Sequence, residues 1–154
     1  MNKRIELSPR LRMVAGLVPP GSRLADVGTD HAYLPAALIQ EGTIPAAIAA
    51  DLRQGPLNRA KATVRECELT GQVAFRLCSG LEGIRPDEVD AVAIAGMGGE
   101  TIADILSAAP WTRERDVPLV LQPMSSMDDL RLWLERHGYT IVKEDLAREG
   151  DTLY

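Results

Sequence analysis

The stretch Arg23–Pro35, RLADVGTDHAYLP, most constrains what this chain can fold into. A short apolar run ends at Gly28, a polar turn follows, and a helical pattern begins near Ala32, which predicts a strand, a tight loop and a helix. In an open α/β sheet such a loop lies at the carboxyl end of the first strand, where small molecules bind. The stretch therefore predicts a nucleotide-type binding site near the N-terminus.

The charges of this loop favour one kind of cofactor over another. The dinucleotide fingerprint G-x-G-x-x-G, started at Gly28, has Asp30 and Tyr33 in place of its later glycines, and Asp30 would repel a pyrophosphate. S-adenosylmethionine carries an ammonium and a sulfonium and no phosphate, so Asp26 and Asp30 favour it on the same electrostatic ground. The loop indicates a methyltransferase and disfavours a nicotinamide enzyme.

Composition limits the class of protein. With 154 residues, of which 45% are apolar, the chain is long enough for one domain with its own core. It has no apolar run near 18 residues and no signal-peptide pattern, so we expect a soluble, cytoplasmic protein without membrane contact. The spacings of Cys67, Cys78 and the two histidines match no zinc or redox pattern, so no metal is expected and both cysteines are predicted to be reduced core residues.

Positive charge gathers near the N-terminus of an otherwise acidic chain. The formal net charge of −5 argues against indiscriminate coating of nucleic acid. Residues 1–23 nevertheless hold five cationic side chains against Glu6 alone, namely Lys3, Arg4, Arg10, Arg12 and Arg23. This segment is interpreted either as an RNA contact, with Arg10 and Arg12 as substrate-binding residues, or as a solubilising helix face.

Hydrophobic periodicity predicts strands that alternate with helices along the whole chain. The predicted strands are residues 24–27, 46–50, 73–78, 89–95, 117–122 and 139–146; the predicted helices are residues 8–18, 32–41, 55 to about 70, 100–106 and 127–137. The right-handed crossover rule turns this order into a doubly wound, mostly parallel sheet. A turn at residues 149–151 then starts a returning antiparallel strand, incomplete at residue 154, which is typical of the Rossmann-like methyltransferase fold.

Two further strand ends carry candidate site residues. Asp51 ends the second strand about 20 residues after the first loop, where an acid reaches the ribose hydroxyls of a nucleoside, although a capping role is the alternative. The AGMGG segment, residues 95–99, ends the fourth strand, beside which methyltransferases place the group to be methylated. Its small side chains leave room for a planar base; the alternative is a loop that needs positive φ at one or two glycines.

The segments DVGTDHAYLP, AIAADL, SGL, AIAGMGGETI and VLQPM, in this order, resemble the bacterial tRNA (adenine-N1)-methyltransferases that modify the adenine at position 22 of tRNA. The N-terminal LSPRLRMVAGLVP is similar to the opening helix of that family, so the resemblance covers essentially the whole chain. It implies S-adenosylmethionine-dependent methyl transfer to adenine N1 of tRNA. Family members continue past the returning strand into a helical domain, so residues 1–154 are expected to be the catalytic domain without that helical domain.

The resemblance also implies roles for residues at matching positions. The implied cofactor-binding residues are Asp26, Gly28, Thr29, Asp30 and His31 at the methionine part, Asp51 and Leu52 at the ribose, Ser79, Gly80 and Leu81 at the adenine, and Ala95 and Gly96 beside them. Met97 and Gly98 would border the target base, and Tyr33 or Met97 would pack on it. Asp30 is the candidate catalytic residue, because a carboxylate near the base stabilises the cation that forms there; cofactor binding alone is the alternative.

Two other functions remain open from the sequence. The chain is either an RNA methyltransferase or a methyltransferase for a small molecule or protein, and scattered rather than gathered N-terminal cations would favour the second. A non-catalytic binding module on the same scaffold is the third hypothesis, against which Asp26, Asp51 and the AGMGG segment speak. The oligomeric state is left open.

Overall fold

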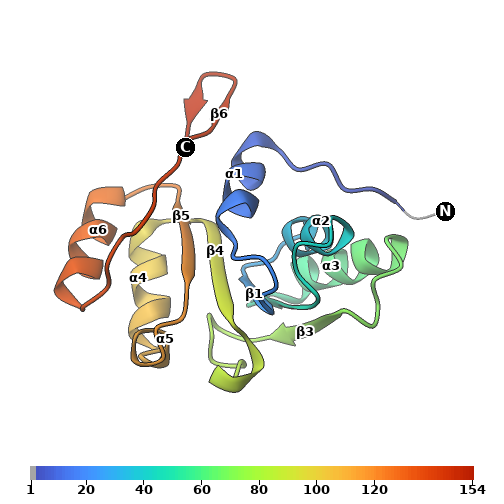
Figure 1. Ribbon diagram of the computed structural model, residues 1–154, viewed down its shortest axis with the longest axis horizontal. Helices are drawn as coiled ribbons and strands as arrows, with labels where there is room; N and C mark the ends of the chain where they lie inside the picture. Colours follow the sequence, from blue (N-terminus) through green and yellow to red (C-terminus); the bar gives the residue numbers. More distant parts are fainter. Residues whose placement is uncertain (1–2) are drawn as a thin grey trace.

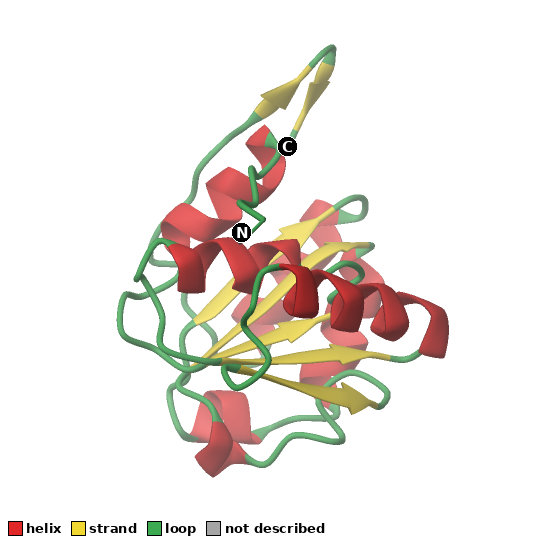
Figure 2. Cartoon of the chain, turned by 90° about the vertical axis from the view of Figure 1, so that its right-hand side faces the viewer, coloured by secondary structure: helices red, strands yellow, loops and turns green. Residues whose placement is uncertain are grey.

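The computed structural model describes residues 3–154, and a five-stranded parallel sheet lies at its centre (Figures 1 and 2). The strands stand in the order β3-β2-β1-β4-β5. They are β1 Leu24–Val27, β2 Ala47–Asp51, β3 Val73–Leu77, β4 Ala91–Met97 and β5 Leu119–Pro123. The predicted fold class is confirmed.

Helices cover both faces of this sheet (Figure 2). They are α1 Pro9–Leu17, α2 Tyr33–Gln40, α3 Gln54–Glu66, the 3-10 turn η1 Pro86–Glu88, α4 Gly99–Ser107, α5 Trp111–Glu114 and α6 Met127–Arg136. The start of α1 is set by Ser8, whose hydroxyl oxygen accepts from the Leu11 N–H at 3.3 Å, and by Pro9 in the first turn. Among residues 3–154, no helix combines the length and apolar character needed to cross a membrane.

The two faces of the sheet bury separate apolar clusters. Leu24 packs with α1, α2 and α3, in a cluster that includes Leu38 and Val64. Ile94 packs on the other face, with Ile102 and further residues of α4 and α6. Because both faces are covered, β1 and the first four residues of β4 are buried, which explains why all of these residues except Asp26 are apolar.

The strand order creates one reversal point. β1 pairs with β2 on one side and with β4 on the other, so the chain winds outward in both directions from these two central strands. In such sheets a crevice opens at the carboxyl ends of the strands where the winding reverses. Strand β4 extends two residues further than predicted, and a register shift against β5 at residues 95–97 leaves Gly96 in a bulge. The reversal point therefore lies beside the loop after β1 and the AGMGG segment.

The strand predicted over residues 139–146 is wrong. This segment is extended but irregular, and it runs past α6 toward the C-terminal hairpin (Figure 1). Its β-branched residues Thr140, Ile141 and Val142 favour a strand, but a strand also needs a neighbour for its backbone N–H and C=O groups. No strand pairs with it in the described part of the chain, and Val142 is 92% exposed. An ion pair between Glu144 and Arg131 joins the segment to α6.

The turn predicted at residues 149–151 is confirmed, but the returning strand does not join the main sheet. β6 (Arg148–Glu149) and β7 (Thr152–Leu153) form a separate antiparallel pair, with Glu149 opposite Thr152. This C-terminal hairpin stands away from the main sheet and beside α1 (Figures 1 and 2). In the described chain, β5 is therefore an edge strand of the main sheet.

Candidate active site

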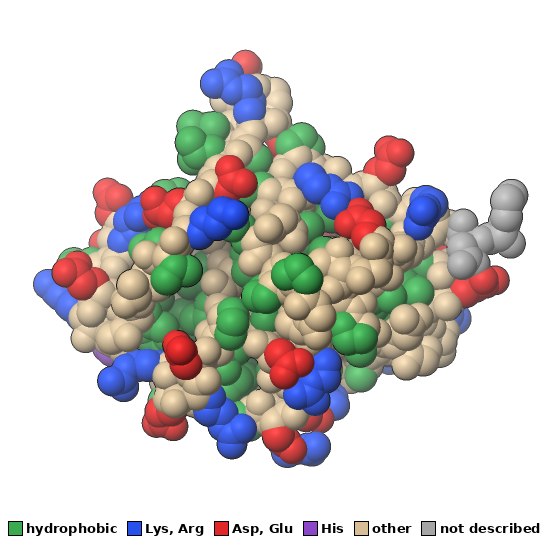
Figure 3. Space-filling model, viewed as in Figure 1, with side chains coloured by type: hydrophobic (Ala, Val, Ile, Leu, Met, Phe, Trp, Pro, Cys, Tyr) green, Lys and Arg blue, Asp and Glu red, His purple; other side chains and the backbone are tan. Residues whose placement is uncertain are grey.

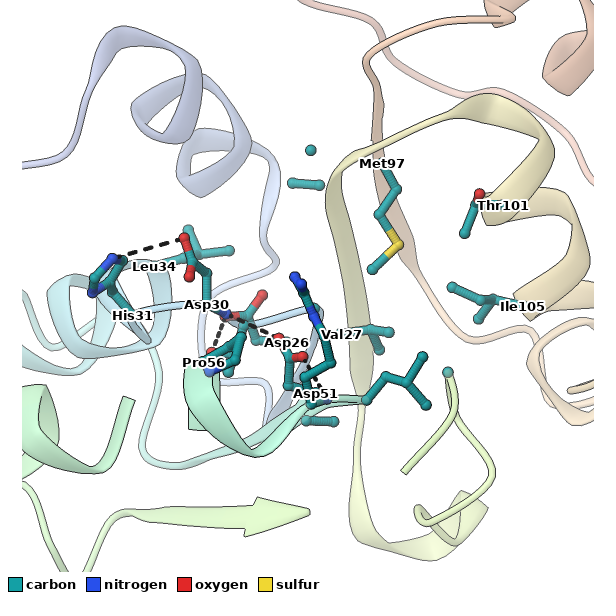
Figure 4. A pocket seen from close by; sticks show the side chains of 18 of the residues that line it. Asp26, Val27, Asp30, His31, Leu34, Asp51, Pro56, Met97, Thr101 and Ile105 are labelled. Atoms are coloured by element: carbon teal, nitrogen blue, oxygen red, sulfur yellow. Dashed lines mark hydrogen bonds and ion pairs between the residues drawn. The ribbon is translucent and has the colours of Figure 1, made fainter. Parts of the chain in front are cut away.

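A pocket of about 510 Å³ lies at the reversal point (Figure 4). Residues from the ends of β1, β2, β3 and β4 line it, together with the start of α1 and one side of α4. The predicted site residues among them are Arg10, Asp26, Gly28, Thr29, Asp30, His31, Tyr33, Asp51, Leu52, Ser79, Gly80, Ala95, Gly96 and Met97. The fold thus brings together side chains from across the first two thirds of the chain.

The loop after β1 is held in place by backbone geometry. The N–H groups of Gly28 and Thr29 both donate to the Ala50 carbonyl oxygen of β2, at 2.9 Å each. Gly28 has a φ of +73°, and Asp30 and Ala32 also adopt left-handed backbone before α2 begins. Glycine adopts this conformation without strain, and aspartate tolerates it better than most residues. The loop therefore turns sharply and directs Asp26 and Asp30 toward the pocket.

Three carboxylates, Asp26, Asp30 and Asp51, form one side of the pocket, which we call the carboxylate wall (Figure 4). Asp26 is only 5% exposed, and its Oδ2 accepts from the Thr29 hydroxyl at 2.7 Å. Burial raises the pKa of Asp26 to about 6; the Thr29 hydrogen bond opposes this shift, and the charges of Asp51 and Asp30 add to it. A cation in the pocket would relieve this repulsion, so the wall favours a positively charged ligand.

Asp51 and Asp30 differ in their surroundings. The Asp51 carboxylate accepts from the Arg53 N–H at 3.0 Å and from the Asp30 N–H at 3.4 Å, so its orientation is fixed by backbone groups. The Asp30 side chain is 62% exposed and pairs with the Arg59 guanidinium at 2.9 Å. Asp30 therefore lies at the rim of the pocket with part of its charge already compensated.

An aromatic pair lies at the same rim. The rings of His31 and Tyr33 stack nearly parallel, with their centroids 4.8 Å apart. The His31 Nε2 lies 3.9 Å from a carboxylate oxygen of Asp30, which is beyond hydrogen-bond distance. The geometry supports a stacking surface better than an acid–base pair.

The opposite side of the pocket is less polar. Met97, Thr101 and Ile105 come from β4 and α4 and face the carboxylate wall across the pocket (Figure 4). The Met97 side chain lies so close to Gly28 that a Cβ there would overlap its terminal methyl group. The Met97 side chain therefore packs against the loop after β1 and bounds the pocket there.

The AGMGG segment is only in part what the sequence predicted. Ala95, Gly96 and Met97 line the pocket, but Gly98 caps α4 beside the Ser125 hydroxyl, and Gly99 is buried. The Gly99 N–H donates to the Ser125 carbonyl oxygen at 2.7 Å. The last two glycines therefore allow close packing against the loop after β5 and leave no open space for a base.

Two other predicted site residues lie outside the pocket. Leu81 is 3% exposed and packs in the α4 side of the core, because the turn after β3 points it inward. Arg12 lies on α1 two residues past Arg10, so it points elsewhere and pairs with Glu41 at 2.7 Å. As an RNA contact, Arg12 stays a prediction.

The N-terminal cations do not form one basic face. Lys3 pairs with Glu66, and Arg23 pairs with Asp90. On the side that Figure 3 shows, Lys and Arg side chains are scattered, and most of them lie next to Asp or Glu. Of the five N-terminal cations, Arg10 alone lines the pocket, and Lys3, Arg12 and Arg23 pair with carboxylates that lie far away in the sequence.

Sequence reasoning missed several residues that shape the site. Those lining the pocket are Leu11, Val27, Leu34, Ala50, Arg53, Pro56, Cys78, Thr101 and Ile105. Cys78 was predicted to be a core cysteine but is half-buried at the pocket, whereas Cys67 is buried as predicted. Gln122, near the end of β5, holds two residues that line the pocket: its amide oxygen accepts from the Arg10 guanidinium and from the Gly96 N–H. The one available signal was position, since all strand ends meet at the same edge of a parallel sheet.

Known proteins are similar to this chain over most of its length. A model of the methyltransferase domain family matches residues 7–154. The tRNA (adenine(22)-N(1))-methyltransferase of Bacillus subtilis is 37% identical over 150 residues, and the chain spans 97% of its own length but 63% of that relative. Within residues 3–154, no group of three or more His, Cys, Asp or Glu side chains is arranged to hold a metal.

Solved structures give the same picture. The crystal structure of B. subtilis TrmK, an m1A22 tRNA methyltransferase, superposes with a TM-score of 0.90 at 36% identity, covering 98% of this chain and 64% of that one. A Streptococcus pneumoniae candidate tRNA (m1A22) methyltransferase, solved with S-adenosyl-L-methionine, gives 0.89 at 40% identity, covering 97% and 70%. The chain therefore belongs to the methyltransferase domain family, among the relatives of the bacterial tRNA (adenine(22)-N1)-methyltransferases.

Proposed function

We propose that this chain is an S-adenosylmethionine-dependent methyltransferase domain that methylates N1 of an adenine in tRNA. The cofactor assignment rests on the buried Asp26 carboxylate, which lines the pocket of about 510 Å³ beside two further carboxylates. The tRNA substrate is inferred from the relatives, which are named for it. We assign residues 1–154 to this one domain, of which residues 1–2 lie outside the described part, and place it in the cytoplasm with its substrate.

The described residues fit this cofactor. Burial is the main cause of the raised pKa of Asp26, and the charges of Asp51 and Asp30 add to it; a ligand with an ammonium and a sulfonium would stabilise the ionised carboxylate against both. We assign Asp51, at the end of β2, to the ribose hydroxyls, and Ser79 and Gly80, after β3, to the adenine. The same negative wall would repel the pyrophosphate of NAD.

Methyl transfer to adenine N1 requires the base and the methyl group to be positioned and requires no proton transfer. Bound S-adenosylmethionine supplies an electrophilic methyl group. Adenine N1 has an in-plane lone pair and no proton, so the protein needs no general base and must hold the base in line. The base must first leave its stack in the tRNA, and the His31–Tyr33 pair or Met97 offers it a new surface. Positive charge then develops on the adenine, which a nearby carboxylate stabilises; we keep Asp30 as the candidate.

One assay separates the three functions that the sequence left open. The full-length protein is incubated with labelled S-adenosylmethionine and unmodified tRNA, and the nucleosides are then analysed. We expect labelled N1-methyladenosine. Label in protein or in a small molecule would support the second function, which the scattered N-terminal cations favour. Cofactor binding without any transfer would support a binding module, and calorimetric binding of NAD alone would refute the cofactor assignment.

Replacing Asp51 by Ala should weaken S-adenosylmethionine binding by roughly 1.5–3 kcal/mol, because a charge-assisted hydrogen bond to the ribose is lost. Asp51→Asn is the matched variant, since it keeps the shape and one acceptor, and we expect it to lose less. Calorimetry on both folded variants measures the difference. Unchanged affinity in Asp51→Ala would refute the ribose assignment.

Replacing Asp30 by Asn removes a charge and keeps the shape, and asparagine tolerates the left-handed backbone at this position. We expect lower turnover at saturating cofactor with little change in unfolding temperature, because the charge near the base is lost. Arg59→Met is the control, since it frees the Asp30 carboxylate instead of removing it. Normal turnover of Asp30→Asn would leave Asp30 without a catalytic role.

A further inference from the structure

Arg10 is the one N-terminal cation that the fold brings into the pocket, and its hydrogen-bond partner differs from those of Arg12, Arg23 and Arg59. Arg12, Arg23 and Arg59 each pair with a carboxylate. The Arg10 Nη1 donates instead to the amide oxygen of Gln122 at 2.8 Å, and no carboxylate lies within 4.0 Å of this guanidinium among residues 3–154. A carboxylate would hold Arg10 and cancel its charge, whereas an amide oxygen holds it and leaves the charge available.

Gln122 is itself rigidly held. It is 4% exposed, and its amide oxygen also accepts from the Gly96 N–H at 3.0 Å. Its amide nitrogen donates to the Pro123 carbonyl oxygen at 3.0 Å, so both ends of the amide are satisfied and its orientation is fixed. One side chain of β5 therefore joins helix α1 to the bulge at Gly96.

Two further contacts fix Arg10 from the other side. Its backbone N–H donates to a carboxylate oxygen of Glu149 at 2.8 Å, and its guanidinium lies 5.9 Å from the ring centroid of Tyr154. Both partners belong to the C-terminal hairpin region, which Figure 1 shows next to α1. The Arg10 guanidinium also lies close to Gly96, since a Cβ there would be 3.4 Å from its Nη1. Arg10 is thus an ordered cation at the side of the pocket where the target base is proposed to enter.

A free cation at this place needs an anion. The methylated adenine carries positive charge, so a guanidinium directed at the base would oppose the reaction. The methionine part of the cofactor brings a carboxylate and the nucleotide that carries the base brings a phosphodiester, and arginine binds either anion through two donors at once. We assign Arg10 to the phosphodiester. Nη1 is used by Gln122, and the other guanidinium donors make no hydrogen bond within the described residues.

We propose that Gln122 is a positioning residue that orients Arg10 so that its guanidinium binds a phosphate beside the methylated nucleotide. This inference rests on the proposed tRNA substrate and adds to it the means by which the nucleotide is held. The residue that touches the substrate is Arg10; Gln122 acts through it.

The test uses the salt dependence of tRNA binding. Each phosphate contact that is lost lowers the slope of log K against log salt concentration by roughly 0.7–0.9. Arg10→Met should lower the slope by this amount. Gln122→Met changes no charge, yet it should lower the slope by a similar amount, and the double variant should lose no more than either single variant. Gln72→Met, an exposed glutamine before β3, is the matched control and should keep the wild-type slope.

Circular dichroism shows whether each variant is folded. Calorimetry with S-adenosylmethionine separates the two anions, because a loss of cofactor binding in Arg10→Met would assign the guanidinium to the carboxylate of the cofactor and overturn the inference. If Gln122→Met does not fold, Gln122→Asn keeps a buried amide that is too short to reach both partners, and we expect the same loss. A wild-type slope in Arg10→Met, or in a folded Gln122 variant, would overturn the inference while leaving the proposed function intact. If the wild-type chain binds the cofactor but no tRNA, the proposed substrate and this inference both fail.

Discussion

Replacing Asp26 by Asn should make the ligand-free protein more stable at pH 8, by about 1–3 kcal/mol, and should also weaken S-adenosylmethionine binding at least tenfold. Asp26 is buried, and its pKa is raised to about 6 from an ordinary value of 3.8. Each pKa unit corresponds to about 1.4 kcal/mol, so ionised Asp26 costs the folded state up to about 3 kcal/mol. Asn carries no charge and can still accept the Thr29 hydroxyl hydrogen bond.

The sign of this effect depends on pH. A carboxyl group with a raised pKa holds its proton more tightly in the folded state, so its contribution to stability is complete below about pH 3.8 and is lost as the pH rises through 6. The stability gain of Asp26→Asn should therefore be largest above pH 6 and should disappear near pH 4. Urea unfolding at pH 4 and pH 8 measures it, with the exposed Asp104→Asn as control. Equal differences at both pH values would contradict the burial of an ionised Asp26.

The affinity of the wild-type protein for S-adenosylmethionine should rise with pH, whereas its stability relative to Asp26→Asn should fall. A cationic ligand needs the ionised carboxylate, so the affinity of the wild-type protein for S-adenosylmethionine should fall as the pH drops below 6. Asp26→Asn should bind weakly at every pH. A flat pH profile for the wild type would show that Asp26 does not contact the cation. If Asp26→Asn is more stable and also binds the cofactor more weakly, the Asp26 charge serves cofactor binding and costs the protein stability.

Replacing Gly99 by Ala should destabilise the protein by up to about 3 kcal/mol, because the added Cβ meets backbone that cannot move aside. It would clash with the Ser126 carbonyl oxygen and lie 2.9 Å from that of Ser125, whose hydrogen bond with the Gly99 N–H joins the β4 and β5 loops. Thermal or urea unfolding measures the loss.

Gly16→Ala is the matched control for this prediction. Gly16 lies within α1, a Cβ there would meet nothing within 4 Å, and its φ is not positive. Alanine in a helix interior is favoured over glycine by roughly 0.5–1 kcal/mol, so this variant should gain stability. If the two variants changed stability alike, the close packing of the AGMGG segment against the loop after β5 would not be real.

Local patterns in the sequence were sufficient to predict which strands and loops form the site. The apolar runs of β1 and β4 predicted strands covered on both faces, and the polar residues that follow the strands predicted a shared binding edge. Asp26 and Asp51 could be located at this edge because Asp26 is the third of the four residues of β1 and Asp51 is the last residue of β2, and the ends of strands need no knowledge of distant partners. The same reasoning predicted the turn at residues 149–151.

Tertiary structure alone decided the features that depend on partners far away in the chain. Residues 139–146 have a β pattern, but a strand exists only where another strand supplies its hydrogen bonds, and none does so among residues 3–154. Arg10 and Arg12 look alike in the sequence, yet the helix turn between them sends one into the pocket and the other to Glu41. Gln122 could be placed near the end of a predicted strand, but its partners could not be predicted, because Arg10 and Gly96 lie 112 and 26 positions away in the chain. The sequence by itself determined which loops form the site, and the packing of distant elements determined which charges in it stay free.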